Sequence, residues 1–150
     1  MSGDVVIKLA GLVLLLCGSA FFSGAEVALF SLNRIQLRRL RHRHPRHGQV
    51  VTRLLDHPHQ LLSTLLLGNI AVNIGAAILG YGVIRGYWPH RAELVAVPVM
   101  SAVLLLFGEV TPKSIMIQHA ERFSLLLARP IEWCIWLTRP VRRAAETRSE

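Results

Sequence analysis

Polar side chains recur at helical spacing inside three apolar stretches of the chain. Two of the stretches carry pairs of polar residues four positions apart, and the third ends in a glutamate; the residues are Ser19, Ser23, Asn69, Asn73 and Glu109. An ionisable group inside a membrane span costs roughly 2.5–3.5 kcal/mol on insertion scales, so it indicates a functional site. Hydroxyl, amide and carboxylate oxygens suit Mg²⁺, Ca²⁺ or Na⁺ rather than zinc or copper. The pattern predicts one cation site shared by three membrane helices.

The depth of these residues in the membrane supports a shared site. Ser23, Asn69 and Glu109 each lie about eight residues inside the cytoplasmic end of their stretch, roughly 12 Å deep at the rise of an α-helix. Pro112 interrupts helical hydrogen bonding just after Glu109, so we expect a broken helix near Gly108 that turns backbone carbonyls toward the ion.

The elements that must position these residues follow from hydropathy. The chain has 150 residues, of which 52% are hydrophobic, and a mean hydropathy of +0.42. This composition predicts one all-α integral membrane domain over residues 1–150, with spans at about 5–31, 61–84 and 94–117, because each run reaches the about 20 residues that cross a bilayer.

Two further segments are predicted to be amphipathic juxtamembrane helices. Residues 34–55 alternate apolar residues with arginines and are expected to break between His42 and Gly48. Residues 120–145 carry Trp133 and Trp136, which favour the membrane interface, and charges and a proline interrupt their apolar run.

Basic residues set the expected orientation and partners. The net charge is +8, and the arginines cluster in residues 31–60 and after the third span. The positive-inside rule places both regions in the cytoplasm and the amino terminus outside. Anionic lipid head groups are the expected partners, whereas nucleic acid is not, because no aromatic stacking pattern accompanies the arginines.

Structural interpretations compete with the cation site. Serines in membrane helices often bond back to their own helix, and asparagines can hold two helices together. Glu109 can be neutralised by Lys113, and Glu26, which continues the serine stripe, either joins the site or pairs with Arg34. Two pairs of small residues in the second span serve either a dimer interface or packing within one chain; they are Ala71/Gly75 and Ala76/Gly80.

Enzymatic and transition-metal functions are disfavoured. Ser23 followed by glycine suggests an intramembrane protease, but every histidine lies outside the predicted spans, so no general base is at hand. The cluster His42, His44 and His47 is surrounded by arginines that repel a metal ion. Cys17 and Cys134 are interpreted as packing residues. We therefore expect that the chain is not an enzyme.

Three motifs resemble those of the cyclin-M/CorC family. Residues 22–31 resemble its FSGxExAxxS signature, residues 65–73 its LLxGNxxxN stretch, and residues 107–113 its FGExxPK motif. The resemblance implies a homodimeric magnesium transport or efflux protein with three spans and a juxtamembrane belt helix. It also implies a cation site made of Ser19, Ser23, Asn69, Asn73, Gly108 and Glu109.

The resemblance carries further expectations. Na⁺ exchange has been proposed for the family, so Na⁺ is a candidate coupling ion. Members usually continue into a cytoplasmic nucleotide-binding CBS module, which is absent from this chain. We expect magnesium transport across the inner (plasma) membrane, with a non-transporting Mg²⁺ sensor or scaffold as the alternative. The transport direction and the choice between Mg²⁺ and Ca²⁺ are left open by the sequence.

Overall fold

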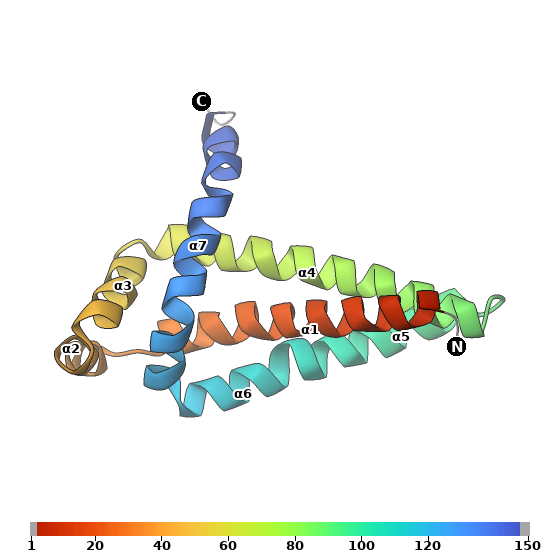
Figure 1. The fold of residues 1–150 in the computed structure, drawn as a ribbon, viewed down its shortest axis with the longest axis horizontal. Coiled ribbons are helices and arrows are strands. Elements are labelled where there is room, and N and C mark those ends of the chain that lie inside the picture. The colour runs from red at the N-terminus through yellow and green to blue at the C-terminus, as the bar shows by residue number, and fades with distance from the viewer. Residues whose placement is uncertain (1–2, 148–150) are drawn as a thin grey trace. The chain divides into compact units, whose positions relative to one another are not determined.

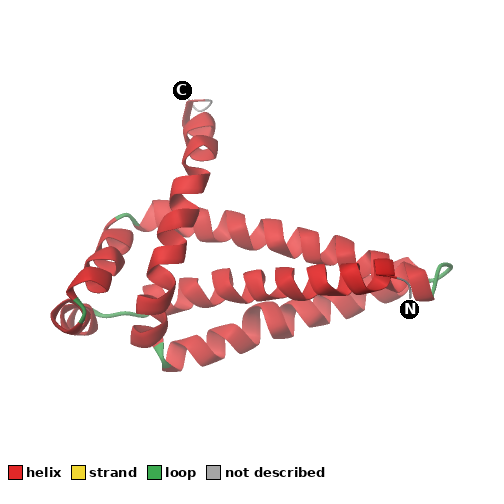
Figure 2. Cartoon of the chain, in the orientation of Figure 1, coloured by secondary structure: helices red, strands yellow, loops and turns green. Residues whose placement is uncertain are grey.

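The computed structural model describes residues 3–147, which are helical nearly throughout and contain no strand (Figures 1 and 2). Figure 1 labels the α-helices, and η1 is a π-helix between α5 and α6. The elements are α1 (Gly3–Phe30), α2 (Arg34–Arg43), α3 (Pro45–Asp56), α4 (Pro58–Tyr87), α5 (Ala92–Val103), η1 (Leu104–Val110), α6 (Thr111–Gln118) and α7 (Ala120–Thr147). The chain divides into two compact units. The first comprises the residues up to Gly24 together with Leu67–Ile115, and the second comprises Ala25–Leu66 and the residues from Met116 onward.

Three helices are long and apolar enough to cross a membrane, as the sequence predicts. They are α1, α4 and the continuous run from α5 through η1 to α6, of 28, 30 and 27 residues. At about 1.5 Å per residue each reaches at least about 40 Å, which exceeds the about 30 Å hydrocarbon core of a bilayer. The helix ends lie within about three residues of the predicted span ends, which is the usual precision of a boundary inferred from sequence.

The first unit is packed through its glycines. The position of a Cβ on Gly75 would lie 3.1 Å from Leu15 of α1, and a Cβ on Gly80 would overlap the side chain of Met100 in α5. Gly75 and Gly80 therefore serve packing within one chain. Large aliphatic side chains on the outward faces stay exposed, among them Leu14 and Ile78. Such exposure is what a lipid-facing helix shows, because hydrocarbon replaces the protein core there.

The second unit contains α2 and α3, which the sequence predicts as one segment interrupted between His42 and Gly48. The observed interruption is a single residue, His44, with an extended backbone (φ −133°, ψ 82°). The residue before a proline is disfavoured in the helical region, and Pro45 starts the next helix. The predicted break is therefore too broad, because Gly48 lies inside α3.

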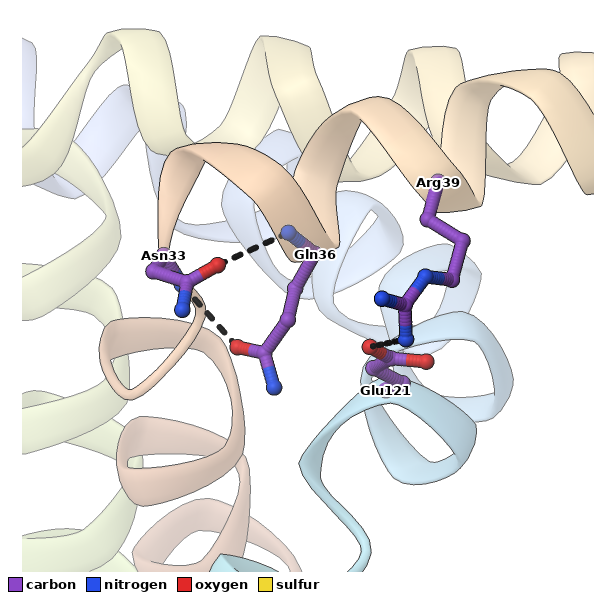
Figure 3. A network of polar contacts seen from close by, with 4 residues as sticks. All are labelled: Asn33, Gln36, Arg39 and Glu121. Atoms are coloured by element: carbon purple, nitrogen blue, oxygen red, sulfur yellow. Dashed lines mark hydrogen bonds and ion pairs between the residues drawn. The ribbon is translucent and has the colours of Figure 1, made fainter.

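Polar contacts hold the ends of the helices in the second unit (Figure 3). The Asn33 side chain accepts a hydrogen bond from the Gln36 backbone N–H at 2.7 Å, and the Asn33 N–H donates to the Gln36 side chain at 3.1 Å. This reciprocal capping box starts α2. Arg39 of α2 and Glu121 of α7 form an ion pair at 3.6 Å. Both side chains are partly exposed, so the pair contributes about 0–1 kcal/mol.

Helix α7 continues through Pro130 and includes the whole of the helix that the sequence predicts over residues 120–145. Leu127, Ala128 and Ile131 are buried on both sides of the proline, and Ser124 donates a hydrogen bond from its hydroxyl to the carbonyl of Ala28 at 3.0 Å. Packing therefore holds the helix together despite the hydrogen bond that a proline removes. The opposite face leaves aromatic side chains exposed.

Gly48 allows α2 and α3 to approach each other, so Gly48→Ala should destabilise the second unit. A Cβ there would lie 2.8 Å from the Cα of Arg41 and 2.9 Å from the carbonyl oxygen of Leu40, and backbone atoms cannot rotate away. We expect a loss of about 1–3 kcal/mol, measured as a lower midpoint of thermal unfolding. Gly86→Ala is the control, because nothing lies within 4 Å of a Cβ at Gly86. Equal midpoints for the two variants would contradict this role of Gly48.

Candidate cation site

Ser19 of α1 lies at the centre of the predicted site. It is fully buried, and its hydroxyl donates to the Oδ1 atom of Asn73 at 2.6 Å, with the Oδ1 atom of Asn69 at 3.3 Å. Both asparagines lie on one face of α4, as their four-residue spacing predicts. The competing interpretation, in which the serine bonds only to its own helix, does not describe Ser19. Three side-chain oxygens from two helices thus meet at one point.

Gly108 brings the third span to the same point. A Cβ on Gly108 would lie 2.7 Å from the Ser19 hydroxyl oxygen, so only glycine permits this approach. Gly108 is buried and lies within the π-helix η1. The sequence predicts a broken helix here, but the structure shows a continuous one whose hydrogen bonds change from α to π type.

The π-helix still supplies polar backbone. The N–H of Thr111 bonds to the carbonyl of Leu106, five residues back, and Pro112 follows at once with no N–H to donate. One carbonyl of the Phe107–Gly108 stretch therefore lacks the donor that residue 112 would otherwise provide. π-Helical turns inside α-helices are frequent at functional sites. A backbone carbonyl that lacks its helical donor near Gly108 therefore does not require a broken helix.

Ser23 lies one helical turn beyond Ser19 and is also buried. Within the described part of the chain its hydroxyl oxygen has no hydrogen-bond partner. A buried hydroxyl without a partner costs about 1–3 kcal/mol, so it is uncommon without a reason. It adds a further oxygen, free to bind a ligand, on the face of α1 that carries Ser19.

Glu109 is the predicted residue that the structure leaves outside this cluster. Its side chain is half-buried and, among the described residues, forms no hydrogen bond or ion pair, so Lys113 does not neutralise it. An added Cβ on its neighbour Gly108 would lie 2.7 Å from the Ser19 hydroxyl oxygen, whereas the Glu109 carboxylate forms no hydrogen bond with Ser19, Asn69 or Asn73 in the part of the chain that the structure describes. Glu26 belongs to the second unit and forms no ion pair with Arg34 in the described residues.

Two glycines that the sequence analysis gave no role make the site possible. A Cβ on Gly68 would lie 2.5 Å from the ring of Phe22, and one on Gly18 would lie 3.3 Å from Val72. Both glycines directly precede a polar site residue. They let α1 and α4 approach closely enough for the asparagines to reach Ser19. The signal in the sequence is a glycine directly before Ser19 and another directly before Asn69.

The donor set defines which ions the site could hold. Within residues 3–147 no group of three or more His, Cys, Asp or Glu side chains comes together as a metal site. The clustered donors are the hydroxyl oxygen of Ser19 and the amide oxygens of Asn69 and Asn73. Such ligands favour hard cations and give little affinity for soft or imidazole-seeking metals.

Comparison with known proteins identifies the family. The model of the cyclin M transmembrane N-terminal domain matches residues 10–149. The UPF0053 inner membrane protein YfjD of Escherichia coli is 34% identical over 132 residues, which cover 83% of this chain and 31% of that protein. A chloroplastic DUF21 domain-containing protein of Arabidopsis thaliana, At1g55930, is 33% identical over 140 residues, covering 92% and 21%.

A UPF0053 protein of Haemophilus influenzae is 34% identical over 113 residues, which cover 75% of this chain and 27% of that protein. The chain therefore spans between about a fifth and a third of the length of these curated relatives. The family match covers nearly all of the three candidate spans and the segments between them. This chain belongs to the cyclin M family and is a transmembrane domain of that family.

Proposed function

We propose that this domain carries Mg²⁺ across the plasma membrane through a partly dehydrated site around Ser19. The observation that supports this most is a mismatch of donors and acceptors. The Ser19 hydroxyl has one hydrogen but lies next to two carbonyl oxygens, at 2.6 and 3.3 Å. Only one of them can accept that hydrogen well, so lone pairs face each other around the buried Ser19 hydroxyl. A cation among the three oxygens would replace this repulsion with coordination.

The spacing of the oxygens suits a small divalent ion. Mg²⁺ binds oxygens at about 2.0–2.1 Å in an octahedron, so neighbouring ligands lie about 3 Å apart. The two separations at Ser19 fall on either side of that value. Ser23 and a carbonyl of η1 offer further oxygens, water completes the shell, and Glu109 supplies the negative charge that a divalent ion needs.

The proposal extends to partners and orientation. The domain is a homodimer with Na⁺ as its coupling ion, it contacts anionic lipids, and it is not an enzyme. Its amino terminus is outside, and residues 31–60 and the tail are in the cytoplasm, because the arginines concentrate there. In the full-length protein a cytoplasmic CBS module would follow, as the greater length of the relatives allows.

Reconstitution in liposomes that contain a Mg²⁺-sensitive dye tests transport. Glu109→Gln keeps the shape of the side chain but removes its charge, and loss of a charged contact costs about 1.5–3 kcal/mol. We therefore expect Mg²⁺ flux to fall at least about tenfold. Glu93→Gln is the control, because Glu93 is exposed in the first turn of α5, away from the site.

Two outcomes would contradict the proposal. Unchanged flux in Glu109→Gln would exclude this carboxylate from the path of the ion. If the unmodified chain binds Mg²⁺ in titrations but shows no flux, the domain is a sensor or scaffold instead of a transporter.

A further inference from the structure

A cavity of about 250 Å³ lies in the second unit, where α3, the start of α4 and α7 meet. α3 contributes Arg53, α7 contributes Trp136 and Arg139, and the start of α4 contributes Gln60 together with His57 just before the helix. Ligand pockets for drug-sized molecules measure about 300–1,000 Å³. The cavity is therefore sized for a small polar group rather than for a whole organic ligand.

The cavity carries excess positive charge. Arg53 forms an ion pair with Glu132 of α7 at 3.4 Å, so the charges of this guanidinium and this carboxylate cancel. Arg139 has no ion-pair partner among the described residues. The first turn of the 30-residue helix α4 also faces this cavity, and a helix amino terminus carries about half a positive charge. An anion is therefore the ligand that this cavity favours.

The surroundings of the cavity favour a lipid as the source of that anion. Trp136, which lines it, is 70% exposed, and Trp133 and Leu137 on the same helix are 78% and 70% exposed. Tryptophan is enriched where hydrocarbon meets the polar head groups of a membrane. A free phosphate ion would gain nothing from this apolar surface, whereas a phospholipid has acyl chains to lay against it.

We propose that the cavity binds the phosphate group of an anionic phospholipid. Arg139 and Arg53 donate hydrogen bonds to the phosphate oxygens, because a guanidinium matches phosphate geometry with two parallel donors. The acyl chains lie along Trp136 and its exposed neighbours. This inference rests on α7 lying at the membrane surface and does not depend on which ion the domain carries.

Quenching of Trp136 fluorescence by brominated lipid tests the proposal. The protein is purified in detergent as Trp88→Phe, Trp133→Phe, so that Trp136 is the only tryptophan. Brominated phosphatidylglycerol should quench it at a several-fold lower mole fraction than brominated phosphatidylcholine. Arg139→Gln should weaken the phosphatidylglycerol effect about fivefold, since each basic residue near a lipid surface contributes a factor of that size. Arg139→Lys should retain most of the preference.

Arg129→Gln is the matched control, because Arg129 is also exposed on α7 but does not line the cavity. If Arg129→Gln weakens quenching as much as Arg139→Gln does, lipid binding depends only on net charge and the proposed site is wrong. If millimolar inorganic phosphate prevents quenching by phosphatidylglycerol, the cavity holds free phosphate and the lipid assignment is wrong. We expect the helical circular dichroism of each variant to be unchanged, because Arg139 is exposed and outside the packed core. An unchanged spectrum would assign a loss of quenching to binding rather than to unfolding.

Discussion

Ser19→Ala should weaken Mg²⁺ binding by about 10–100-fold, because it removes the one oxygen that contacts both asparagines. The two carbonyl oxygens then lose the group that holds them at one point, and the ion loses a ligand as well. The effect on stability should be much smaller, since a side-chain hydrogen bond between membrane helices contributes about 0.6 kcal/mol on average. Calorimetric titration of purified protein measures the binding, and thermal unfolding measures the stability.

Ser101→Ala provides the matched control for this experiment. Ser101 is a serine in the third candidate span, exposed on α5 and outside the cluster, so the same chemical change there should leave Mg²⁺ affinity within about twofold. Wild-type affinity in Ser19→Ala would remove Ser19 from the site. An equal loss in both variants would point to a general disturbance of the spans.

Gly108→Ala should abolish detectable Mg²⁺ binding through a clash with Ser19. The added Cβ would lie 2.7 Å from the Ser19 hydroxyl oxygen, which is closer than real Cβ contacts allow. Either Ser19 rotates away from Asn73 or η1 moves away from α1, and both changes dismantle the oxygen cluster. Overpacking of this kind costs about 1–3 kcal/mol, so the unfolding midpoint should fall as well. Titration and thermal unfolding together report both effects.

A double variant separates the clash from the chemistry. In Gly108→Ala with Ser19→Ala, the nearest atom to the new Cβ is the Cβ of residue 19 at 3.4 Å, an ordinary contact. Stability should therefore return, whereas binding should not, because the hydroxyl is gone. Gly82→Ala, whose Cβ would lie 3.7 Å from Lys8, should change neither quantity by much. Normal binding in Gly108→Ala would show that η1 does not approach Ser19.

The spans could be predicted because the signal for them is local and strong. Runs of apolar residues longer than about 20 have few alternatives to a membrane helix. The predicted interruption between α2 and α3 is too broad. Glycine is common in turns, but Gly48 lies inside α3, where it allows close packing against Arg41. Pro130 interrupts the apolar run but not the helix, since buried neighbours such as Ile131 keep α7 continuous.

The site could be predicted in part. The spacing of Ser19, Asn69 and Asn73 predicts that their side chains converge, and the structure joins them by hydrogen bonds, whereas their binding of a cation stays a prediction. The sequence could not show which serine bonds to the asparagines and which stays without a partner, because that depends on the rotation of α1 against α4. The π-helix could not be predicted from the sequence either, because its hydrogen bonds depend on tertiary packing around Gly108 rather than on local preference.

The π-helix makes the number of residues in this stretch matter as much as their identity. A π-type turn accommodates one more residue than an α-type turn, so η1 acts as a one-residue insertion absorbed without a loop. A one-residue deletion within Leu104–Val110 would let the segment relax to α geometry and would leave the residues that follow, Pro112 and Lys113 among them, on about the same face. The same deletion in α4 would rotate every following residue of that helix by about 100° around its axis. A gap in an alignment at η1 therefore indicates loss of the π-helix rather than a shift of the residues after it.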